Sequence, residues 1–321
     1  MSDNIKDVWL IGSGAMAVEY AKVLLAMQVP FKVIGRGKDS ADQFMKQVDC
    51  PVITGGLKKW LEHSTTIPDA AIVAVSVQNL AETTEMLINA GVKKILVEKP
   101  GGQNSDEIAQ VVQAAEKNVA DVFVAYNRRF YASTLEAKKI IAEDGGVTSF
   151  VFEFTEWSHV IEKLSSPPEI KEKWFLCNST HVIDLAFFLG GEPTYIHSIT
   201  SGGLSWHPKA AVFAGAGVTK EGALFTYHAN WEAPGRWGVE ILTRKHRLIL
   251  CPLEQLQVQK IGSLSADIVS LNDHVDQMFK PGLYRQVKAF LYGENNIWLL
   301  PLKQQHEHIL NIYSVILRTK L

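Results

Sequence analysis

The hydrophobic positions in the first third of the chain alternate between short continuous apolar runs and stretches with helical spacing. The runs predict buried strands, and the stretches, where apolar residues recur every three or four positions, predict amphipathic helices. This alternation indicates a parallel sheet with helices on both faces. The predicted strands are 8–11, 31–34, 70–75, 94–97 and 122–125, and the predicted helices are 15–27, 40–48, 57–63, 80–90 and 108–118.

The pattern changes around Tyr126, where alternating runs separated by turn signals replace the strand–helix order. Consecutive alternating runs predict a mostly antiparallel sheet. We therefore expect an α/β chain: a domain with a doubly wound parallel sheet over 1–125, then an α+β domain with a mostly antiparallel sheet over 126–321. In the second domain the predicted strands are 150–155, 195–200, 223–231, 238–243, 247–251 and 256–260, and the predicted helices are 135–143, 181–189, 283–292 and 305–317.

Composition narrows the class of protein. The 321 residues are 47% hydrophobic and 21% charged, as in an ordinary globular protein of two domains. A net charge of -2 gives no whole-chain attraction to nucleic acid or to an anionic membrane, and no apolar stretch predicts a membrane span. Cys50, Cys177 and Cys251 are far apart and form no CxxC pair, so we expect a reducing cytoplasm.

A glycine-rich turn follows the first predicted strand. Residues 12–17 fit G-x-G-x-x-A and lead directly into the first predicted helix. Glycines permit a tight turn and close approach of backbone amides to a pyrophosphate, which the helix N-terminus attracts. We therefore predict a dinucleotide site here, rather than a plain tight turn. Its predicted residues are Gly12, Ser13, Gly14, Ala15 and Met16.

The end of the second predicted strand bears on the choice of cofactor. An NAD-preferring site usually has an acidic residue there for the ribose hydroxyls, whereas this chain has Gly35 followed by Arg36. An arginine can bind a 2′-phosphate and stack on adenine. We therefore favour NADP(H) over NAD(H), the alternative being that Arg36 is a solvated loop residue. We also assign Ser76, which follows the strand 70–75, to the cofactor site.

Two further motifs carry chemistry. Lys99 ends the buried strand 94–97 in the sequence Glu98-Lys99-Pro100, where desolvation can tune an ammonium to donate a proton or anchor a ligand. The alternative is a simple strand terminator. His181 and Asp184 lie one helical turn apart and either share a working face or form a polar helix start. Two ligands at this spacing do not complete a zinc site, so we predict no metal.

Together these motifs resemble the Gfo/Idh/MocA family of NAD(P)-dependent oxidoreductases. They occur in family order, with similar spacing, over essentially the whole chain. The resemblance rests on the glycine-rich turn, Glu98-Lys99-Pro100, Asn127-Arg128-Arg129-Phe130 at the domain junction, and His181-Val182-Ile183-Asp184 followed by Leu189-Gly190-Gly191. It implies a Rossmann domain joined to an α/β domain with an open sheet.

The resemblance also implies roles for individual residues. His181 would be the acid/base for the substrate hydroxyl, because a histidine of near-neutral pKa suits that proton transfer. Lys99 would hydrogen-bond the reacting oxygen, and Glu98 and Lys99 would also border the cofactor. Asp184 would help to place His181 or contact substrate, and Asn127 would lie by the substrate at the domain junction.

One position departs from the family. Many members carry an aspartate four residues before the histidine, and here that position holds Cys177, followed by Asn178. The carboxylate that would grip a polyol is therefore missing, and Asn178 could supply a hydrogen bond instead. We interpret Cys177 as a pocket-wall residue, because no base for a covalent role stands beside it in sequence. The loss mildly favours a substrate with its own anionic group.

Aromatic and basic residues before and around the histidine leave two interpretations open. Trp157 and Trp174 either pack in a core or line the substrate pocket, as this segment does in the family. Arg128 and Arg129 either contact an anionic substrate or pair with acids, and we expect structural pairing for at least one of them.

The resulting hypothesis is an oxidoreductase that transfers a hydride between a nicotinamide cofactor and the alcohol or carbonyl of a sugar, polyol or activated sugar. The alternative is a non-catalytic dinucleotide-binding sensor or scaffold, which would have no need of the Lys99 and His181 pair. We expect a carbohydrate-like small molecule as partner, no nucleic acid and no membrane. The open sheet of the second domain favours a homodimer or homotetramer.

Overall fold

The computed structural model describes residue 5 and residues 7–319. The chain forms two compact units. The first comprises Met1–Asn127 and Val275–His306, and the second comprises Arg128–His274 and Glu307–Leu321. The chain thus leaves the first unit at the Asn127 region and returns to it late in the sequence.

The first unit is built on a seven-stranded sheet with the order β15-β6-β5-β4-β1-β2-β3. Every pairing is parallel except that of β15 with β6. The N-terminal strands are β1 (Val8–Ile11), β2 (Phe31–Ile34), β3 (Val52–Ile53), β4 (Ala70–Val73), β5 (Lys94–Val97) and β6 (Asp121–Val124); the late strand is β15 (Leu300–Pro301).

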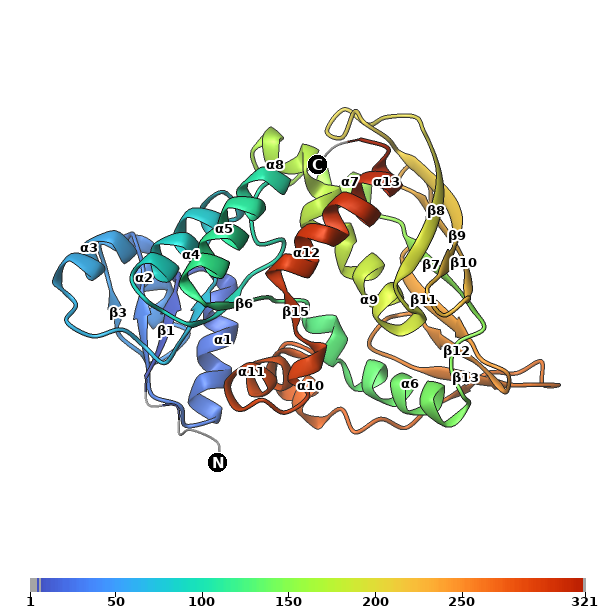
Figure 1. Ribbon diagram of the computed structural model, residues 1–321, viewed down its shortest axis with the longest axis horizontal. Coiled ribbons are helices and arrows are strands. Elements are labelled where there is room, and N and C mark those ends of the chain that lie inside the picture. The colour runs from blue at the N-terminus through green and yellow to red at the C-terminus, as the bar shows by residue number, and fades with distance from the viewer. Residues whose placement is uncertain (1–4, 6, 320–321) are drawn as a thin grey trace. The chain divides into compact units, whose positions relative to one another are not determined.

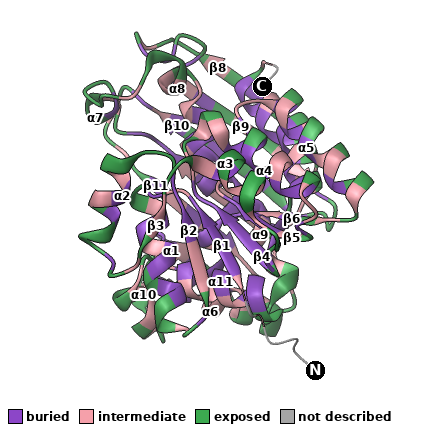
Figure 2. Cartoon of the chain, turned by 90° about the vertical axis from the view of Figure 1, so that its left-hand side faces the viewer, coloured by how far each residue is buried: buried purple, intermediate pink, exposed green. Residues whose placement is uncertain are grey.

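Helices cover both faces of this sheet. Figure 1 shows α4 and α5 together above the strands and α1 and α11 together below them, and the members of each pair are in contact. The strands β1, β4 and β5 are buried because they lie between these layers, as the purple centre of Figure 2 shows for β1 and β4. The helices are α1 (Ala15–Ala26), α2 (Lys38–Met45), α3 (Gly56–His63), α4 (Leu80–Asn89), α5 (Ser105–Asn118), α10 (His274–Met278), α11 (Leu283–Tyr292) and α12 (Leu302–His308).

The second unit is built on an eight-stranded sheet with the order β14-β13-β12-β11-β7-β10-β9-β8. Its pairings are antiparallel except that of β7 with β10, which is parallel. Its strands are β7 (Ser149–Phe154), β8 (Pro193–Ser201), β9 (Val212–Thr219), β10 (Leu224–Asn230), β11 (Trp237–Leu242), β12 (His246–Leu250), β13 (Gln257–Lys260) and β14 (Asp267–Ile268). Both sheets confirm the predicted fold class.

One face of the second sheet is covered by helices. Helix α9 packs on β7 and β11, and α13 packs on β8 and β9. Alternate residues of β7, among them Phe150, Phe152 and Phe154, point inward and form an aromatic core. The helical segments are α6 (Ala132–Glu143), α7 (Ser158–Ile161), α8 (Pro168–Glu172), a π-helical turn (Phe175–Ser179), α9 (Thr180–Gly190), a second π-helical turn (Ile309–Tyr313) and α13 (Ser314–Leu317).

Strand β9 was absent from the sequence prediction, and its glycines explain why. A Cβ on Gly217 would lie 2.8 Å from Phe225 Cε1, and Gly215 makes a similarly close approach to Tyr227. The two glycines therefore make room for aromatic rings of the neighbouring strand β10. A glycine-rich run lacks the β-branched pattern that marks a strand.

Candidate functional site

The glycine-rich turn lies between β1 and α1. Gly12 has φ +120°, and an added Cβ would lie 2.8 Å from the carbonyl carbon of Ala74, so only glycine fits. Gly14 precedes α1, and a Cβ there would meet nothing within 4 Å. The first turn of α1 contains no acidic residue. The open space at this helix start therefore fits a cofactor pyrophosphate.

The turn after β2 is built from small residues. Ser13 Oγ donates to Ser40 Oγ at 2.9 Å, and Ser40 Oγ donates to the Gly37 carbonyl at 3.1 Å. A Cβ on Gly35 would lie 2.8 Å from both Ser13 Oγ and Val52 Cγ1, which excludes an acidic side chain without rearrangement. Arg36 is exposed beside this turn.

The Glu98-Lys99-Pro100 segment follows β5. Tyr20 Oη donates to Glu98 Oε1 at 2.7 Å. Burial raises the pKa of Glu98, opposed by Lys99 and by the Tyr20 hydrogen bond, and burial with the nearby Glu98 also raises the pKa of Tyr20. The Lys99–Pro100 peptide is cis. Gln305 Nε2 donates to the Pro100 carbonyl at 3.3 Å, so the returning segment anchors this loop.

The remaining predicted residues of the first unit are positioned by local bonds. Ser76 follows β4, and its Oγ accepts a hydrogen bond from Asn79 Nδ2 at 2.7 Å. Asn127 is buried, and its Nδ2 donates to the Pro281 carbonyl at 2.9 Å. The predicted cofactor residues follow β1, β2, β4 and β5, which are parallel neighbours. They therefore share the carboxyl edge of the sheet, where such folds bind dinucleotides.

In the second unit, His181 lies in the first turn of α9 and is 6% exposed. Its ring centroid is 6.3 Å from that of Trp237, the first residue of β11. Lys99 belongs to the first unit and His181 to the second.

Asp184 forms a buried ion pair with Arg129. Arg129 Nε donates to Asp184 Oδ2 at 2.8 Å, and Nη2 donates to Oδ1 at 2.6 Å. Burial opposes the Arg129 charge, but Asp184 outweighs it and raises the pKa of the guanidinium. Both carboxylate oxygens are engaged, which favours a structural role for Asp184. The expected structural pairing of at least one of the two arginines is confirmed.

Sequence reasoning missed a buried carboxylate, Glu156, just after β7. It is 2% exposed. Asn178 Nδ2 donates to both of its oxygens at 3.1 Å, and Ser179 Oγ donates to Oε1 at 2.8 Å. Burial raises the pKa of Glu156, and these donors with Arg236 oppose the rise. The available signal was an acid at the end of a strongly apolar strand, the same kind of position as Lys99.

The other predicted substrate residues of the second unit lie on both sides of α7 and α8 in the sequence. Cys177 is 6% exposed and lies in the π-helical turn before α9. Trp174 makes an edge-on contact with Trp206. Trp157 is 48% exposed, and its Nε1 donates to the Gly235 carbonyl at 3.0 Å. Trp174 is thus half-buried against a second indole, whereas Trp157 presents much of its ring to solvent.

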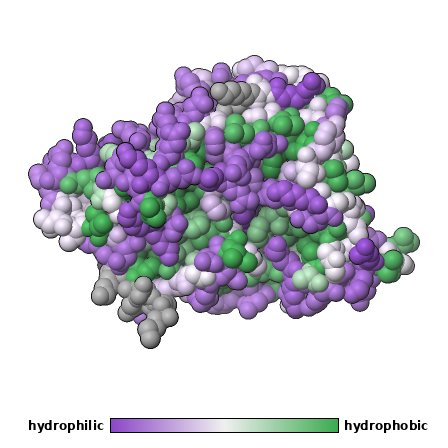
Figure 3. Space-filling model, in the orientation of Figure 1, coloured by the Kyte–Doolittle hydropathy of each residue, from purple (hydrophilic) through white to green (hydrophobic). Residues whose placement is uncertain are grey.

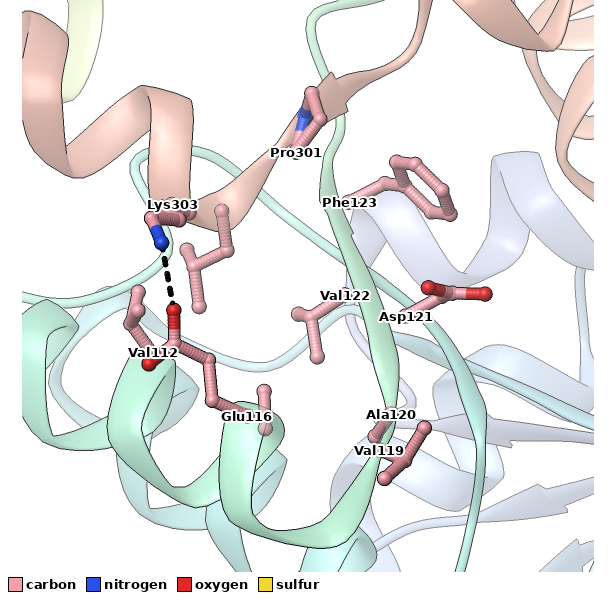
Figure 4. A pocket seen from close by; sticks show the side chains of 11 residues that line it. Val112, Glu116, Val119, Ala120, Asp121, Val122, Phe123, Pro301 and Lys303 are labelled. Carbon is pink, nitrogen blue, oxygen red and sulfur yellow. Dashed lines mark hydrogen bonds and ion pairs between the residues drawn. The ribbon is translucent and has the colours of Figure 1, made fainter.

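A surface pocket of about 410 Å³ lies between the end of α5, strand β6 and β15 (Figure 4). Lys303 Nζ pairs with Glu116 Oε1 at 2.8 Å among its lining residues. None of the residues predicted for the cofactor or the substrate lines it. The pocket therefore adds nothing to the candidate site.

Two features are absent from the part of the chain that the structure describes. No helix there has the length and apolar character needed to cross a membrane. No group of three His, Cys, Asp or Glu side chains in that part of the chain is arranged to hold a metal ion.

Solved structures with the same fold include sugar dehydrogenases. A UDP-N-acetylglucosamine 3-dehydrogenase from Acidithiobacillus ferrooxidans is 14% identical with TM-score 0.73, covering 98% of this chain and 97% of that one. A levoglucosan dehydrogenase bound to NADH and levoglucosan is 18% identical with TM-score 0.76, covering 98% and 96%. A putative NADPH-dependent oxidoreductase from Desulfitobacterium hafniense is 18% identical with TM-score 0.78, covering 99% and 95%.

Comparison of the sequence with protein families is more specific. No curated protein sequence matches the chain. Residues 6–126 match the model of the family described as an oxidoreductase family with an NAD-binding Rossmann fold. This match confirms, over residues 6–126, the resemblance to the Gfo/Idh/MocA family that the motifs of the chain carry.

Proposed function

We propose that this chain is an NAD(P)-dependent oxidoreductase acting on a CH–OH group, or the corresponding carbonyl, of a sugar, polyol or activated sugar. The observation that carries the proposal is the combination of an open, glycine-lined start of α1 with Lys99 at the carboxyl edge of the same sheet. The sugar substrates named for solved structures of the same fold support the substrate class.

The residues would divide the work as follows. A bound nicotinamide supplies or accepts the hydride. The amides of the Gly12–Gly14 turn hold the pyrophosphate at the start of α1. His181 takes the hydroxyl proton during oxidation and returns it during reduction. Lys99 donates a hydrogen bond to the reacting oxygen and stabilises the negative charge that develops there.

We infer a preference for NADP(H) over NAD(H). Gly35 leaves no room for the acidic side chain that would select NAD(H), and the exposed Arg36 is available to a 2′-phosphate. Competitive titration with both cofactors tests this preference. Arg36→Gln should weaken NADP(H) binding and leave NAD(H) binding unchanged. Tighter binding of NAD(H) by the wild type would overturn the preference.

The catalytic assignment is tested by Lys99→Ala and His181→Ala. Both variants should keep cofactor binding, measured by fluorescence titration, while turnover falls by about 10²–10⁴-fold for His181→Ala. Exposed Lys117→Ala and His63→Ala serve as matched controls and should behave as wild type. A screen of sugars, polyols and sugar nucleotides with both cofactors supplies the turnover assay.

The same variants discriminate against a non-catalytic sensor or scaffold. A sensor binds the dinucleotide without needing an acid/base pair. If the screen finds no substrate and both variants bind cofactor as the wild type does, the results support a non-catalytic sensor or scaffold. If both variants lose cofactor binding equally, the catalytic assignment is wrong.

We also propose that a second copy of the chain covers the open face of the second sheet. Alternate residues of β8 and β10 point to this face and are exposed. Some of them are large and apolar, including Tyr195, Ile199 and Leu224. Figure 3 shows further apolar atoms at the far right end, where Figure 1 places the loop after β13. Light scattering after gel filtration should give a dimer or tetramer, and Ile199→Asp should yield monomer.

The cytoplasmic location belongs to the same proposal. Cys50, Cys177 and Cys251 form no disulfide with one another, and a reducing compartment maintains this state. Fractionation of cells expressing the tagged chain tests it.

A further inference from the structure

A guanidinium in the second unit stacks on two indole rings. Arg236 Cζ lies 4.7 Å from the ring centroid of Trp157 and 4.5 Å from that of Trp237. Such contacts between a cation and aromatic rings favour one side-chain orientation. Arg236 therefore has little rotational freedom to lose when a ligand binds.

The sheet register builds this arrangement. Strand β7 pairs antiparallel with β11, and Trp237 lies opposite Phe154, so the residues after β7 run beside those before β11. The Trp157 Nε1 hydrogen bond to Gly235 then fixes the indole next to Arg236. A Cβ on Gly235 would lie 2.9 Å from Thr155 Cγ2, so glycine permits this close approach.

The donors of Arg236 are available to a ligand. Its side chain is 45% exposed, and its nearest carboxylate oxygen, Glu156 Oε2, is 3.9 Å away, beyond hydrogen-bond distance. Among the described residues no acceptor forms a hydrogen bond with this guanidinium. The oxygens of Glu156 are already engaged by Asn178 and Ser179.

A second positive charge lies against the same ring. Arg128 Cζ is 4.8 Å from the Trp237 centroid. Burial lowers the pKa of Arg128; Tyr131 and Glu254 oppose this, Arg236 adds to it, and Glu156 opposes it more weakly. Both guanidiniums thus lie against one indole and repel each other, and an anion beside them would relieve this repulsion. His181 contacts the same indole.

From this geometry we propose that Arg236 binds an anionic group of the substrate, a carboxylate or a phosphate, and thereby selects anionic sugars over neutral ones. A planar guanidinium with its donors exposed matches the paired oxygens of either group. The inference rests on the proposed function, because it assigns a substrate class to the same site. Arg236 acts here in substrate specificity and takes no part in the proton transfer.

The test compares matched ligands on the full chain saturated with cofactor. Each hexose is paired with its uronate, its 6-phosphate and its UDP ester, and binding is measured by titration calorimetry alongside kcat and KM. We expect at least one anionic member to bind more tightly than its neutral partner, and to weaken at high salt. The preferred member of each set identifies whether the anion is a carboxylate, a sugar phosphate or a nucleotide diphosphate.

Arg236→Gln should weaken binding of the preferred anionic ligand roughly 10- to 100-fold, the effect of losing hydrogen bonds to a charged group, and leave neutral ligands unchanged. Arg236→Lys keeps the charge and should retain part of the preference. Arg244→Gln, an exposed arginine of the same unit, is the matched control and should bind as wild type. Thermal unfolding of each variant checks that it is folded.

Three results would overturn the proposal. The wild type binds no anionic member in preference to its neutral partner, Arg236→Gln keeps the preference, or Arg236→Gln loses cofactor binding to the same extent as ligand binding. These outcomes differ from failure of the proposed function. Arg236-dependent binding of an anion without any turnover would contradict the proposed enzymatic function and support the anion site. Turnover of neutral sugars alone would support the enzymatic function and contradict the anion site.

Discussion

Two arginine–carboxylate pairs in the second unit differ in how far each is closed to other ligands. Arg129 and Asp184 form two direct hydrogen bonds, and both side chains are at least nine-tenths buried. Arg236 and Glu156 are 3.9 Å apart; the acid is buried and the arginine is nearly half exposed. The first pair leaves no carboxylate oxygen unoccupied, whereas the second leaves the arginine donors facing solvent.

The difference teaches how burial separates structural from binding roles. A buried pair cannot lose one partner without leaving a charge in a medium of low dielectric. A half-exposed arginine remains solvated when its partner is removed. When Arg236 is removed instead, the buried Glu156 keeps its hydrogen bonds from Asn178 and Ser179, so this pair contributes little to stability. The pair of Arg129 and Asp184 therefore fixes α9, whereas Arg236 beside Glu156 presents a cation to solvent.

The largest effect is expected from breaking the buried pair of Arg129 and Asp184. Arg129→Ala should lower the free energy of unfolding by about 3–5 kcal/mol, because Asp184 is left buried and uncompensated. Urea unfolding followed by tryptophan fluorescence measures it. The double variant with leucine at both positions removes both charges and should be more stable than Arg129→Ala. A single-variant cost below about 1 kcal/mol would remove the distinction between the pairs.

The next effect concerns the loop that carries Arg236. Gly235→Ala places a methyl group 2.9 Å from Thr155 Cγ2 and should cost about 1–3 kcal/mol through overpacking. Gly238→Ala, whose Cβ would have its nearest contacts at 3.6 Å, is the matched control. Thermal unfolding compares the two. Equal stability would show that the close approach of the loop to β7 is not constrained.

A smaller effect follows from the raised pKa of Glu156. Because the folded state favours the protonated acid, the wild type loses stability as pH rises from the ordinary value of 4.5 through the raised pKa. Glu156→Gln lacks this loss. Near pH 4 the two chains should differ by less than about 1 kcal/mol, and the difference should move in favour of the variant toward pH 8. Unfolding curves at a series of pH values measure it, and a parallel pH dependence would contradict the assignment.

The smallest effect on stability is expected for the pair of Arg236 and Glu156. Arg236→Gln should change the free energy of unfolding by less than about 1 kcal/mol, because Arg236 is nearly half exposed and Asn178 and Ser179 still donate to the buried Glu156. Arg247→Gln, which removes a similarly exposed partner of Glu240, gives the reference value. A loss comparable to that of Arg129→Ala would mean that Arg236 is structural.

The parallel sheet and the cofactor turn could be predicted because their signals are local. Continuous apolar strands such as Ala70–Val73 and the glycines before α1 depend on neighbours in sequence. The neighbourhood of Glu156 and Arg236 was not predicted, because it depends on strand register. The register brings the residues after β7 beside those before β11. Sequence predicted that Asp184 places His181 or contacts substrate, and it could not show that both carboxylate oxygens accept from Arg129.

Strand β15 completes the first sheet by pairing Leu300 and Pro301 with Val124 and Phe123 of β6. During translation, residues 1–127 leave the ribosome long before β15 has been synthesised. Until then β6 is an edge strand whose backbone groups on that side are unpaired. Helix α11, which packs on α1, also arrives late. During synthesis the first unit is thus completed only after residues 128–274 of the second unit have been translated.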